Sequence, residues 1–248
     1  MGIIPLVKDV KGKKISTVDF PYYWYNTQSS FSESIRTIRT GIVLESLDSP
    51  AKVIVITSTM PGEGKSTVAL NLGSALGQME NVLVIGADLR RPTLASKLKM
   101  QGDIEGLSDY LGGEAKLGDC IHHNEEANCY VLPAGKIPSH PLEMLSSTKF
   151  KELLERLKTK FDRIVIDSAP THAVSDALVL SSNADTVVYV VKANETPAKL
   201  IRQGLRRLRE STDVSVGIVL NDFDESKLSA YAGGGYYYDG YYSSRKSG

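Results

Sequence analysis

The stretch that decides the fold is Ser58-Thr59-Met60-Pro61-Gly62-Glu63-Gly64-Lys65-Ser66-Thr67. It follows an apolar, β-branched run, Val53–Thr57, and it opens a segment whose apolar residues lie three and four positions apart. Glycines between a strand and a helix let backbone amides turn inward around phosphate oxygens, and the helix N-terminus adds partial positive charge. The stretch therefore predicts a phosphate-binding loop. We expect its nucleotide contacts to come from Pro61, Gly62, Glu63, Gly64, Lys65, Ser66 and Thr67.

Two side chains of this loop carry specific expectations. Lys65 can reach the outer phosphates of a nucleotide, and the Ser66 hydroxyl can ligate Mg²⁺. The motif usually begins with a glycine, whereas Thr59 stands at that position in this chain. A glycine-rich turn in front of a core helix would use the same residue types, so that alternative stays open at this point.

The rest of the chain alternates between apolar runs and helical patterns. The predicted strands are Val53–Thr57, Asn81–Ile85, Cys129–Leu132, Arg163–Ile166, Thr186–Val191 and Ser215–Leu220. Uniformly apolar runs of this kind are typical of parallel strands that are buried on both faces. The predicted core residues of the first helix after the loop are Val68, Leu72, Ala75, Leu76 and Met79, and further helices begin near Ser147 and Pro197. The alternation predicts an α/β fold: a mostly parallel sheet with helices on both faces.

Charged side chains follow two of these strands. Asp167 comes directly after Arg163–Ile166, where a carboxylate can hold Mg²⁺. Asp88 and Arg90 come after Val82–Ile85; the carboxylate could serve the metal or accept a proton, and the arginine could steady phosphate charge. Two alternatives stay open, because Asp167 could merely cap the next turn and Asp88 could merely pair with Arg90.

The candidate site therefore draws on several strand ends. The predicted catalytic residues are Lys65, Asp88, Asp167 and Arg90, and the predicted metal ligands are Ser66, Asp88 and Asp167. Asn221 ends the last predicted strand and is a further candidate for nucleotide binding. Its amide could read adenine, or it could simply tie down the turn.

Composition limits the classes of partner. The chain of 248 residues has 29 Lys+Arg and 29 Asp+Glu, so it has no global basic field and we expect no nucleic-acid partner. Hydrophobic residues make up 42%, which is enough for a substantial core. The apolar runs are much shorter than the roughly 20 residues that span a bilayer. Cys120 and Cys129 indicate a reducing compartment rather than a disulfide scaffold, and with His122 and His123 they match no zinc pattern.

The two ends of the chain differ from the middle. The first thirty residues show no clear period and are expected to form an extended arm. Ser30-Phe31-Ser32-Glu33 is similar to a capping box for a helix over Phe31–Ser46. Six of the chain's 12 tyrosines lie in the glycine-rich stretch from Tyr231 to the end, where we expect a mobile tail. The predicted organisation is an arm (1–30), a phosphate-loop domain (31–230) and a tyrosine tail (231–248).

Three motifs taken together resemble those of a known family. Pro61-Gly62-Glu63-Gly64-Lys65-Ser66, Ala87-Asp88-Leu89-Arg90-Arg91-Pro92 and Ile166-Asp167-Ser168-Ala169-Pro170 are similar to motifs of bacterial tyrosine kinases, the BY-kinases of Wzc/CpsD/CapB type. Such kinases have a MinD-like P-loop fold and control the export of capsule and exopolysaccharide. Glu33-Ser34-Ile35-Arg36-Thr37-Ile38-Arg39-Thr40 also resembles the family's Glu-x-x-Arg-x-x-Arg assembly motif.

The resemblance implies a tyrosine autokinase that uses ATP and Mg²⁺ and acts in trans within a ring of identical chains. The implied phosphorylation sites are Tyr231, Tyr236, Tyr237, Tyr238, Tyr241 and Tyr242, and the implied assembly residues are Glu33, Arg36 and Arg39. A local Glu33–Arg36 pair is the alternative for the assembly motif. One departure matters: Gly86 stands where the family's second motif has its first acid. Either Asp88 and Asp167 share that acid's task, or activity is weakened.

The resemblance also implies a setting. We expect the cytoplasmic face of the bacterial inner membrane, with either a transmembrane and periplasmic part of the same protein or a separate membrane activator. An opposing tyrosine phosphatase is a further expected partner. Gly2-Ile3-Ile4-Pro5-Leu6 resembles the segment after the second transmembrane helix of the fused type, so the chain is expected to be a fragment. The rival functions are a MinD/ParA-like ATPase, whose additional loop lysine is missing here, and an ATP-responsive scaffold without phosphotransfer.

Overall fold

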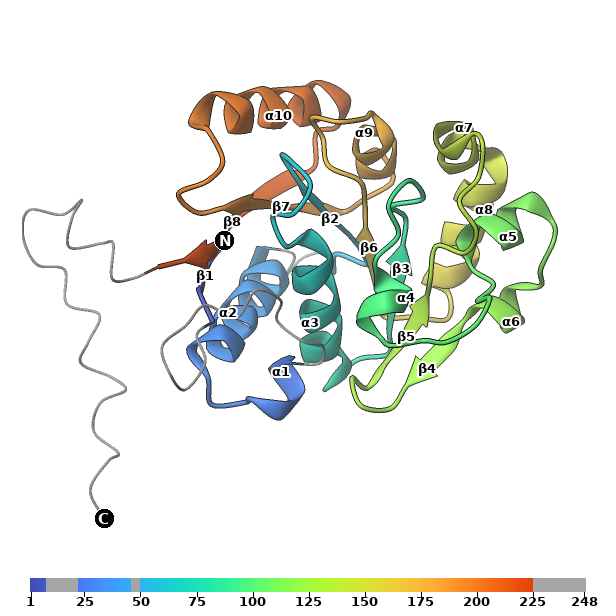
Figure 1. Cartoon of the computed structure of the whole chain (residues 1–248), viewed down its shortest axis with the longest axis horizontal. Coiled ribbons are helices and arrows are strands. Elements are labelled where there is room, and N and C mark those ends of the chain that lie inside the picture. The colour runs from blue at the N-terminus through green and yellow to red at the C-terminus, as the bar shows by residue number, and fades with distance from the viewer. Residues whose placement is uncertain (8–21, 46–49, 225–248) are drawn as a thin grey trace, which may run out of the picture.

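The computed structural model describes residues 1–7, 22–45 and 50–224, which form a sheet covered by helices (Figure 1). The strands are β1 (Gly2–Pro5), β2 (Val53–Ser58), β3 (Val82–Gly86), β4 (His122–Asn124), β5 (Cys129–Leu132), β6 (Arg163–Asp167), β7 (Thr186–Lys192) and β8 (Ser215–Phe223). The helices are α1 (Tyr22–Tyr25), α2 (Ser30–Glu45), α3 (Lys65–Gly77), α4 (Leu94–Lys97), α5 (Leu107–Gly112), α6 (Leu117–Cys120), α7 (Pro141–Ser146), α8 (Thr148–Lys158), α9 (Asp176–Ser181) and α10 (Ala198–Ser211).

The sheet has the strand order β1-β8-β7-β2-β6-β3-β5-β4, and every neighbouring pair is parallel except β4 with β5. All six predicted strands are present, each with its bounds shifted by at most a few residues. Strand β2 lies in the middle between β7 and β6, and β3 lies next to β6. The carboxyl ends of β2, β6 and β3 therefore meet at one edge of the sheet, which is where parallel α/β sheets bind ligands.

Successive strand residues feed two separate cores, one on each face of the sheet. Ile54 and Ile56 of β2 belong to one core with helices α2 and α3, whereas Val53 and Val55 belong to the other with α8, α9 and α10. Figure 1 shows α1, α2 and α3 on one side of the sheet and α9 and α10 on the other. The predicted doubly covered α/β fold is confirmed.

The first thirty residues contribute structure that the sequence pattern did not indicate. Residues Gly2–Pro5 form β1, a strand added beside β8, and Tyr22–Tyr25 form the short helix α1. The side chain of Tyr23 in α1 is fully buried, and its backbone amide donates to Oδ1 of Asn71 in α3 over 2.9 Å. Residues 8–21 lie outside the described part of the chain.

Two details of the predicted helices are wrong. Helix α2 begins at Ser30, and its cap is the preceding Ser29, whose hydroxyl accepts from the amide of Ser32 at 3.1 Å. The predicted Ser30–Glu33 capping box is not formed, because the Glu33 carboxylate pairs with Arg36 instead. Met79 was expected in the core, yet helix α3 ends at Gly77 and leaves Met79 82% exposed.

The cysteines are free and buried, and burial raises the pKa of Cys120 to about 11 and that of Cys129 to about 12. Thiols with such pKa values stay protonated at neutral pH, so neither is poised to react. Within the described ranges no cluster of three or more His, Cys, Asp or Glu side chains has the arrangement of a metal site, and no helix there is long and apolar enough to cross a membrane.

Helix α3 offers a matched test of which apolar positions form the core. We predict that Leu72→Ala lowers the free energy of unfolding by about 2–5 kcal/mol, because Leu72 is fully buried between α3 and the sheet. Met79→Ala, at a position with the same spacing beyond the helix end, should change it by less than about 0.5 kcal/mol. Urea titration of both variants measures the difference, and equal losses would contradict the burial described here.

Candidate active site

The stretch from Ser58 to Thr67 forms a loop between the end of β2 and the start of α3, as its sequence predicted. Gly62 and Gly64 adopt positive φ angles of 85° and 93°, which side chains rarely tolerate. Space is also restricted at Gly64, because a Cβ there would overlap Nδ2 of the Asn221 side chain. Glycine is therefore required at this position for both conformational and steric reasons.

Neighbouring strand ends hold the loop in place. Asn221, at the end of β8, donates from Nδ2 to the Glu63 carbonyl over 2.9 Å. The buried Glu63 carboxylate accepts from the Met60 amide at 2.6 Å and from the Thr196 hydroxyl, and it lies 3.4 Å from the Lys192 amide. The Asn221 side chain thus ties down the phosphate loop, which is close to one of its two predicted roles. The Glu63 side chain faces protein, so any nucleotide contact of this residue would come from its backbone.

The side chain of Lys65 lies between two carboxylates. Its Nζ atom is 2.9 Å from Asp88 Oδ2 and 3.5 Å from Asp167 Oδ1, and all three side chains are buried. Burial disfavours the charged ammonium, but the carboxylates of Asp167 and Asp88 outweigh that effect and raise the pKa of Lys65. Lysine is therefore fully protonated here. The sequence predicted that these three residues would share a site, and the strand order explains why they do.

Asp167 is the most deeply buried acid of the site. It is 1% exposed, and neither of its carboxylate oxygens has a hydrogen-bond partner. Burial raises the pKa of Asp167 in spite of the nearby ammonium of Lys65, which lowers it. The 3.5 Å ion pair of Oδ1 with Lys65 leaves the hydrogen-bonding capacity of both oxygens unused, so the carboxylate can still serve as a cation ligand.

The oxygen atoms around Asp167 suit Mg²⁺. The Ser66 hydroxyl is 3.3 Å from Lys65 Nζ, and Asp88 and Asp167 contact the same ammonium, so the three predicted metal ligands do gather at one place. Carboxylate and hydroxyl oxygens are the ligands that this hard cation prefers. Sequence reasoning missed Thr93, whose hydroxyl donates to Ser66 Oγ over 2.9 Å. A hydroxyl residue directly after the Asp88–Pro92 motif was the available signal.

Gly86 lies at the end of β3, opposite Asp167 in the register of β3 and β6. A Cβ at this position would be 3.1 Å from the backbone nitrogen of Ala134 and 3.5 Å from Leu94 Cδ2. The loop after β5 therefore occupies the space toward which a side chain would point. An acid at position 86 would require this loop to move by a few tenths of an ångström. The packing around position 86 therefore suits the glycine that stands here in place of the family's acid.

The guanidinium of Arg90 is held by an ion pair and is not free to turn toward the candidate active site. Its guanidinium forms a two-point ion pair with Asp176, with Nε 2.8 Å from Oδ2 and Nη2 3.0 Å from Oδ1. Asp176 begins α9 and is fully buried, and it raises the pKa of Arg90. The expected alternative, an Asp88–Arg90 pair, is absent among the ion pairs of the described chain; Asp88 Oδ1 instead accepts from the Arg91 amide at 3.0 Å. The role of Arg90 in catalysis stays a prediction.

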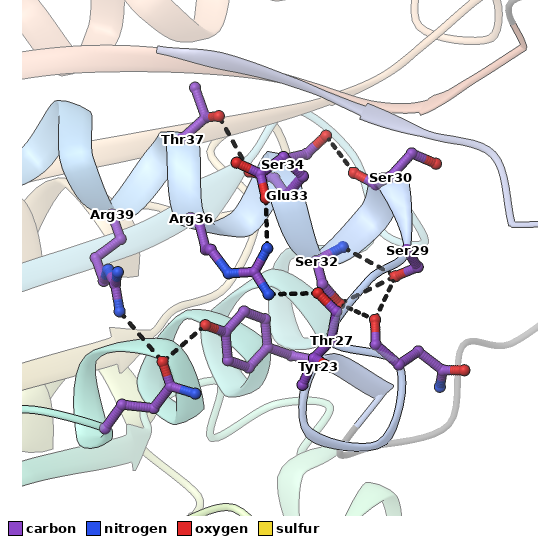
Figure 2. Close-up of polar contacts among 12 residues, drawn as sticks. Tyr23, Thr27, Ser29, Ser30, Ser32, Glu33, Ser34, Arg36, Thr37 and Arg39 are labelled. Atoms are coloured by element: carbon purple, nitrogen blue, oxygen red, sulfur yellow. Dashed lines mark hydrogen bonds and ion pairs between the residues drawn. The ribbon is translucent and has the colours of Figure 1, made fainter. Parts of the chain in front are cut away.

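The three residues of the assembly motif, Glu33, Arg36 and Arg39, lie on helix α2 (Figure 2). Glu33 and Arg36 form an exposed ion pair three residues apart, and Arg36 also donates to the Thr27 carbonyl. Arg39 donates to the Ala75 carbonyl over 2.8 Å. The local pair that was left open is therefore present in the single chain, and the assembly role stays a prediction. The six tail tyrosines lie outside the described residues.

Comparisons with known proteins show which family the chain belongs to. The family model "AAA domain" matches residues 51–214. The tyrosine-protein kinase CpsD of Streptococcus agalactiae is 34% identical over 195 residues, covering 78% of this chain and 84% of that protein. The solved kinase domain of the Escherichia coli tyrosine kinase ETK superposes with a TM-score of 0.81 at 27% identity, covering 96% of this chain and 93% of that one.

The same fold extends to a wider group of ATPases. The septum site-determining protein MinD of Pyrococcus horikoshii, solved in complex with Mg-ADP, has a TM-score of 0.56 and 27% identity over 68% of this chain and 70% of that one. The kinase relatives cover more of the chain and superpose more closely. The chain therefore belongs to the family of bacterial tyrosine-protein kinases, with the P-loop fold that this family shares with MinD.

Proposed function

We propose that this chain transfers the γ-phosphoryl group of ATP to tyrosines of its own C-terminal cluster. The single observation that carries the proposal is the gathering of Lys65, Asp88 and Asp167 at the mouth of the phosphate loop. In this transfer the bond from the γ-phosphorus to the β-phosphate oxygen breaks, a bond to the tyrosine oxygen forms, and ADP leaves. The hydroxyl proton passes to a carboxylate of the site.

The residues divide the work according to their chemistry. Lys65, which is fully protonated, is suited to bind the outer phosphates and to offset the charge that builds on them. Mg²⁺, when held by Ser66, Asp88 and Asp167, would supply further neutralisation of phosphate charge. One of the two carboxylates of the site, Asp88 or Asp167, would accept the hydroxyl proton of a phenol whose pKa is near 10.

The last described residue of the chain lies close to this site. Asn221 contacts the phosphate loop, and Asp224, the last described residue, is three positions further along the chain. The described part of the chain thus ends at the edge of the sheet that carries the candidate active site. We propose that the following tyrosine cluster is delivered to its own site or to that of a neighbour, and the resemblance to ring-forming kinases favours the neighbour.

We further propose the setting that the resemblance implies. The chain would act at the cytoplasmic face of the inner membrane, as part of or beside a membrane protein that handles capsule or exopolysaccharide polymerisation and export. A tyrosine phosphatase would reverse the modification. Phosphate groups add about −1.5 to −2 charges each to a tail that is close to neutral, which gives the phosphorylated and unmodified tails different electrostatics.

A mixing experiment tests both the chemistry and its direction. We predict that Lys65→Met lowers self-labelling by about 10²-fold or more, because it removes the cation that serves the phosphates. A second variant, with all six tail tyrosines changed to Phe, should keep the active site and lose the acceptors. If transfer occurs in trans, mixing the two with ATP and Mg²⁺ should place phosphotyrosine on the Lys65→Met chain, as read by mass spectrometry.

The controls separate the rival functions. Lys151→Met, an exposed lysine on α8, should label like the wild-type chain. Labelling of Lys65→Met alone would contradict the assigned site, and an unlabelled mixture beside a labelled wild type would contradict transfer in trans. Release of free phosphate without phosphotyrosine would identify a MinD-like ATPase. Binding of ADP with neither product would identify a scaffold.

The assembly motif can be tested without losing its local ion pair. We predict that Glu33→Arg combined with Arg36→Glu dissociates the oligomer, because it reverses the charges that a neighbour meets while keeping an opposite pair on α2. The free energy of unfolding should fall by about 1–2 kcal/mol, since the swap removes the Arg36 hydrogen bond to the Thr27 carbonyl and its contact with the Tyr23 ring, and places a cation in the first turn of α2. Sedimentation velocity gives the oligomer size.

The matched control swaps the pair Arg206 and Glu210 on α10, which lie 3.6 Å apart with the charges in the opposite order along the helix. This control should leave the oligomer unchanged. An oligomer that survives the α2 swap, or a wild-type chain that does not oligomerise, would refute the assembly role.

A further inference from the structure

Thr59 replaces the glycine that usually opens the phosphate-loop motif, and its side chain is fully buried. A buried hydroxyl needs a hydrogen-bond partner, because an unpaired one carries a desolvation cost. The partner is Tyr189, a residue of β7 that is 130 positions further along the chain. Tyr189 Oη donates to Thr59 Oγ1 over 3.0 Å.

Tyr189 is itself fully buried, and its hydroxyl meets a second threonine. Thr171 Oγ1 lies 3.0 Å from Tyr189 Oη, and it also lies 3.1 Å from the carbonyl of Ser58, the residue before Thr59. The Thr171 amide donates to the same Ser58 carbonyl over 2.8 Å. Burial raises the pKa of Tyr189, so its hydroxyl keeps its proton at neutral pH and can donate it.

Helix α10 leaves room for this hydroxyl. Gly204 of α10 packs directly over it, and a Cβ at Gly204 would overlap Tyr189 Oη and crowd Thr171 Oγ1. Glycine lowers helix stability by about 1 kcal/mol relative to alanine, so its presence in the middle of α10 calls for a packing reason. Arg207 of the same helix donates to the Thr171 carbonyl, which fixes α10 to the segment after β6.

The three hydroxyls of Thr59, Tyr189 and Thr171 therefore form one buried network that joins the first residue of the phosphate loop to β7 and to the segment after β6. We propose that Tyr189 is a positioning residue for the phosphate loop: it holds Thr59 so that the loop amides are already oriented when the nucleotide binds. A glycine at position 59 could not make this bond. The inference rests on the proposed nucleotide site and adds to it a residue that does not touch the ligand.

A role limited to packing makes a different prediction from a positioning role. The ring of Tyr189 fills the core in either case, and phenylalanine would preserve it. Only the positioning role requires the hydroxyl for nucleotide affinity, because a loop that must be ordered on binding binds more weakly than one that is already ordered.

The experiment measures ADP affinity by calorimetry in the full chain with Mg²⁺. Tyr189→Phe should raise the Kd for ADP and the KM for ATP by about three- to tenfold, the range that corresponds to one hydrogen bond, with kcat changed less than twofold. Thr59→Val should do the same, whereas Thr59→Ser, which keeps the hydroxyl, should bind like the wild type. The double variant Tyr189→Phe/Thr59→Val should bind no more weakly than Tyr189→Phe alone, since that change already removes the bond to Thr59 together with the contact to Thr171.

Tyr23→Phe is the matched control. Tyr23 is also fully buried, and its hydroxyl donates to Gln78 over 2.9 Å at the far end of α3 (Figure 2). This variant should lose thermal stability in the same way as Tyr189→Phe but keep wild-type ADP affinity. Wild-type affinity in Tyr189→Phe, or additive losses in the double variant, would overturn the inference. A wild-type chain that binds no ADP would instead refute the nucleotide site itself.

Discussion

The site depends on one buried ammonium that serves two buried carboxylates. Lys65 lies 2.9 Å from Asp88 and 3.5 Å from Asp167, so the cluster has one positive charge for two acids. Burying unbalanced charge is unfavourable, and proteins accept it where another ligand completes the balance. The carboxylate oxygens of Asp167, which make no hydrogen bond, are where this imbalance is located. The strand order allows the cluster to form, because the adjacent ends of β2, β6 and β3 bring the three residues together.

Much of the fold was predictable because the central strands are apolar on both faces. Runs such as Val53–Thr57 are typical of buried parallel strands, and the acids that follow Arg163–Ile166 and Val82–Ile85 then fall at one edge of the sheet. Strands β1 and β4 were missed for the opposite reason. Each is short and lies at an edge of the sheet, and the His-His-Asn sequence of β4 has no apolar pattern at all.

The contacts that hold the site could not be read from spacing. Asp176 pairs with Arg90 across 86 positions, and Tyr189 reaches Thr59 across 130. Such partners are determined by how the strands and helices pack. The hydrophobic pattern within one segment therefore does not predict them. Met79 shows the converse error: its spacing fits the core face of α3, but the helix ends before it. Periodicity fixes a face only for residues that are still in the helix.

Helix α3 connects the phosphate loop to the assembly motif, two regions that are separate in the sequence. Lys65 of the phosphate loop is its first residue, and near its last turn the carbonyl of Ala75 accepts from Arg39 of the assembly motif. Gln78 contacts both Tyr23 and Arg39 at that end (Figure 2). A cation that donates to carbonyls at a helix C-terminus stabilises the helix. Arg39 therefore has a structural task within its own chain, and replacing it would disturb α3 as well as any interface. Arg36 also contacts the Thr27 carbonyl and the Tyr23 ring, so Glu33 is the residue of the motif that reports on assembly most cleanly.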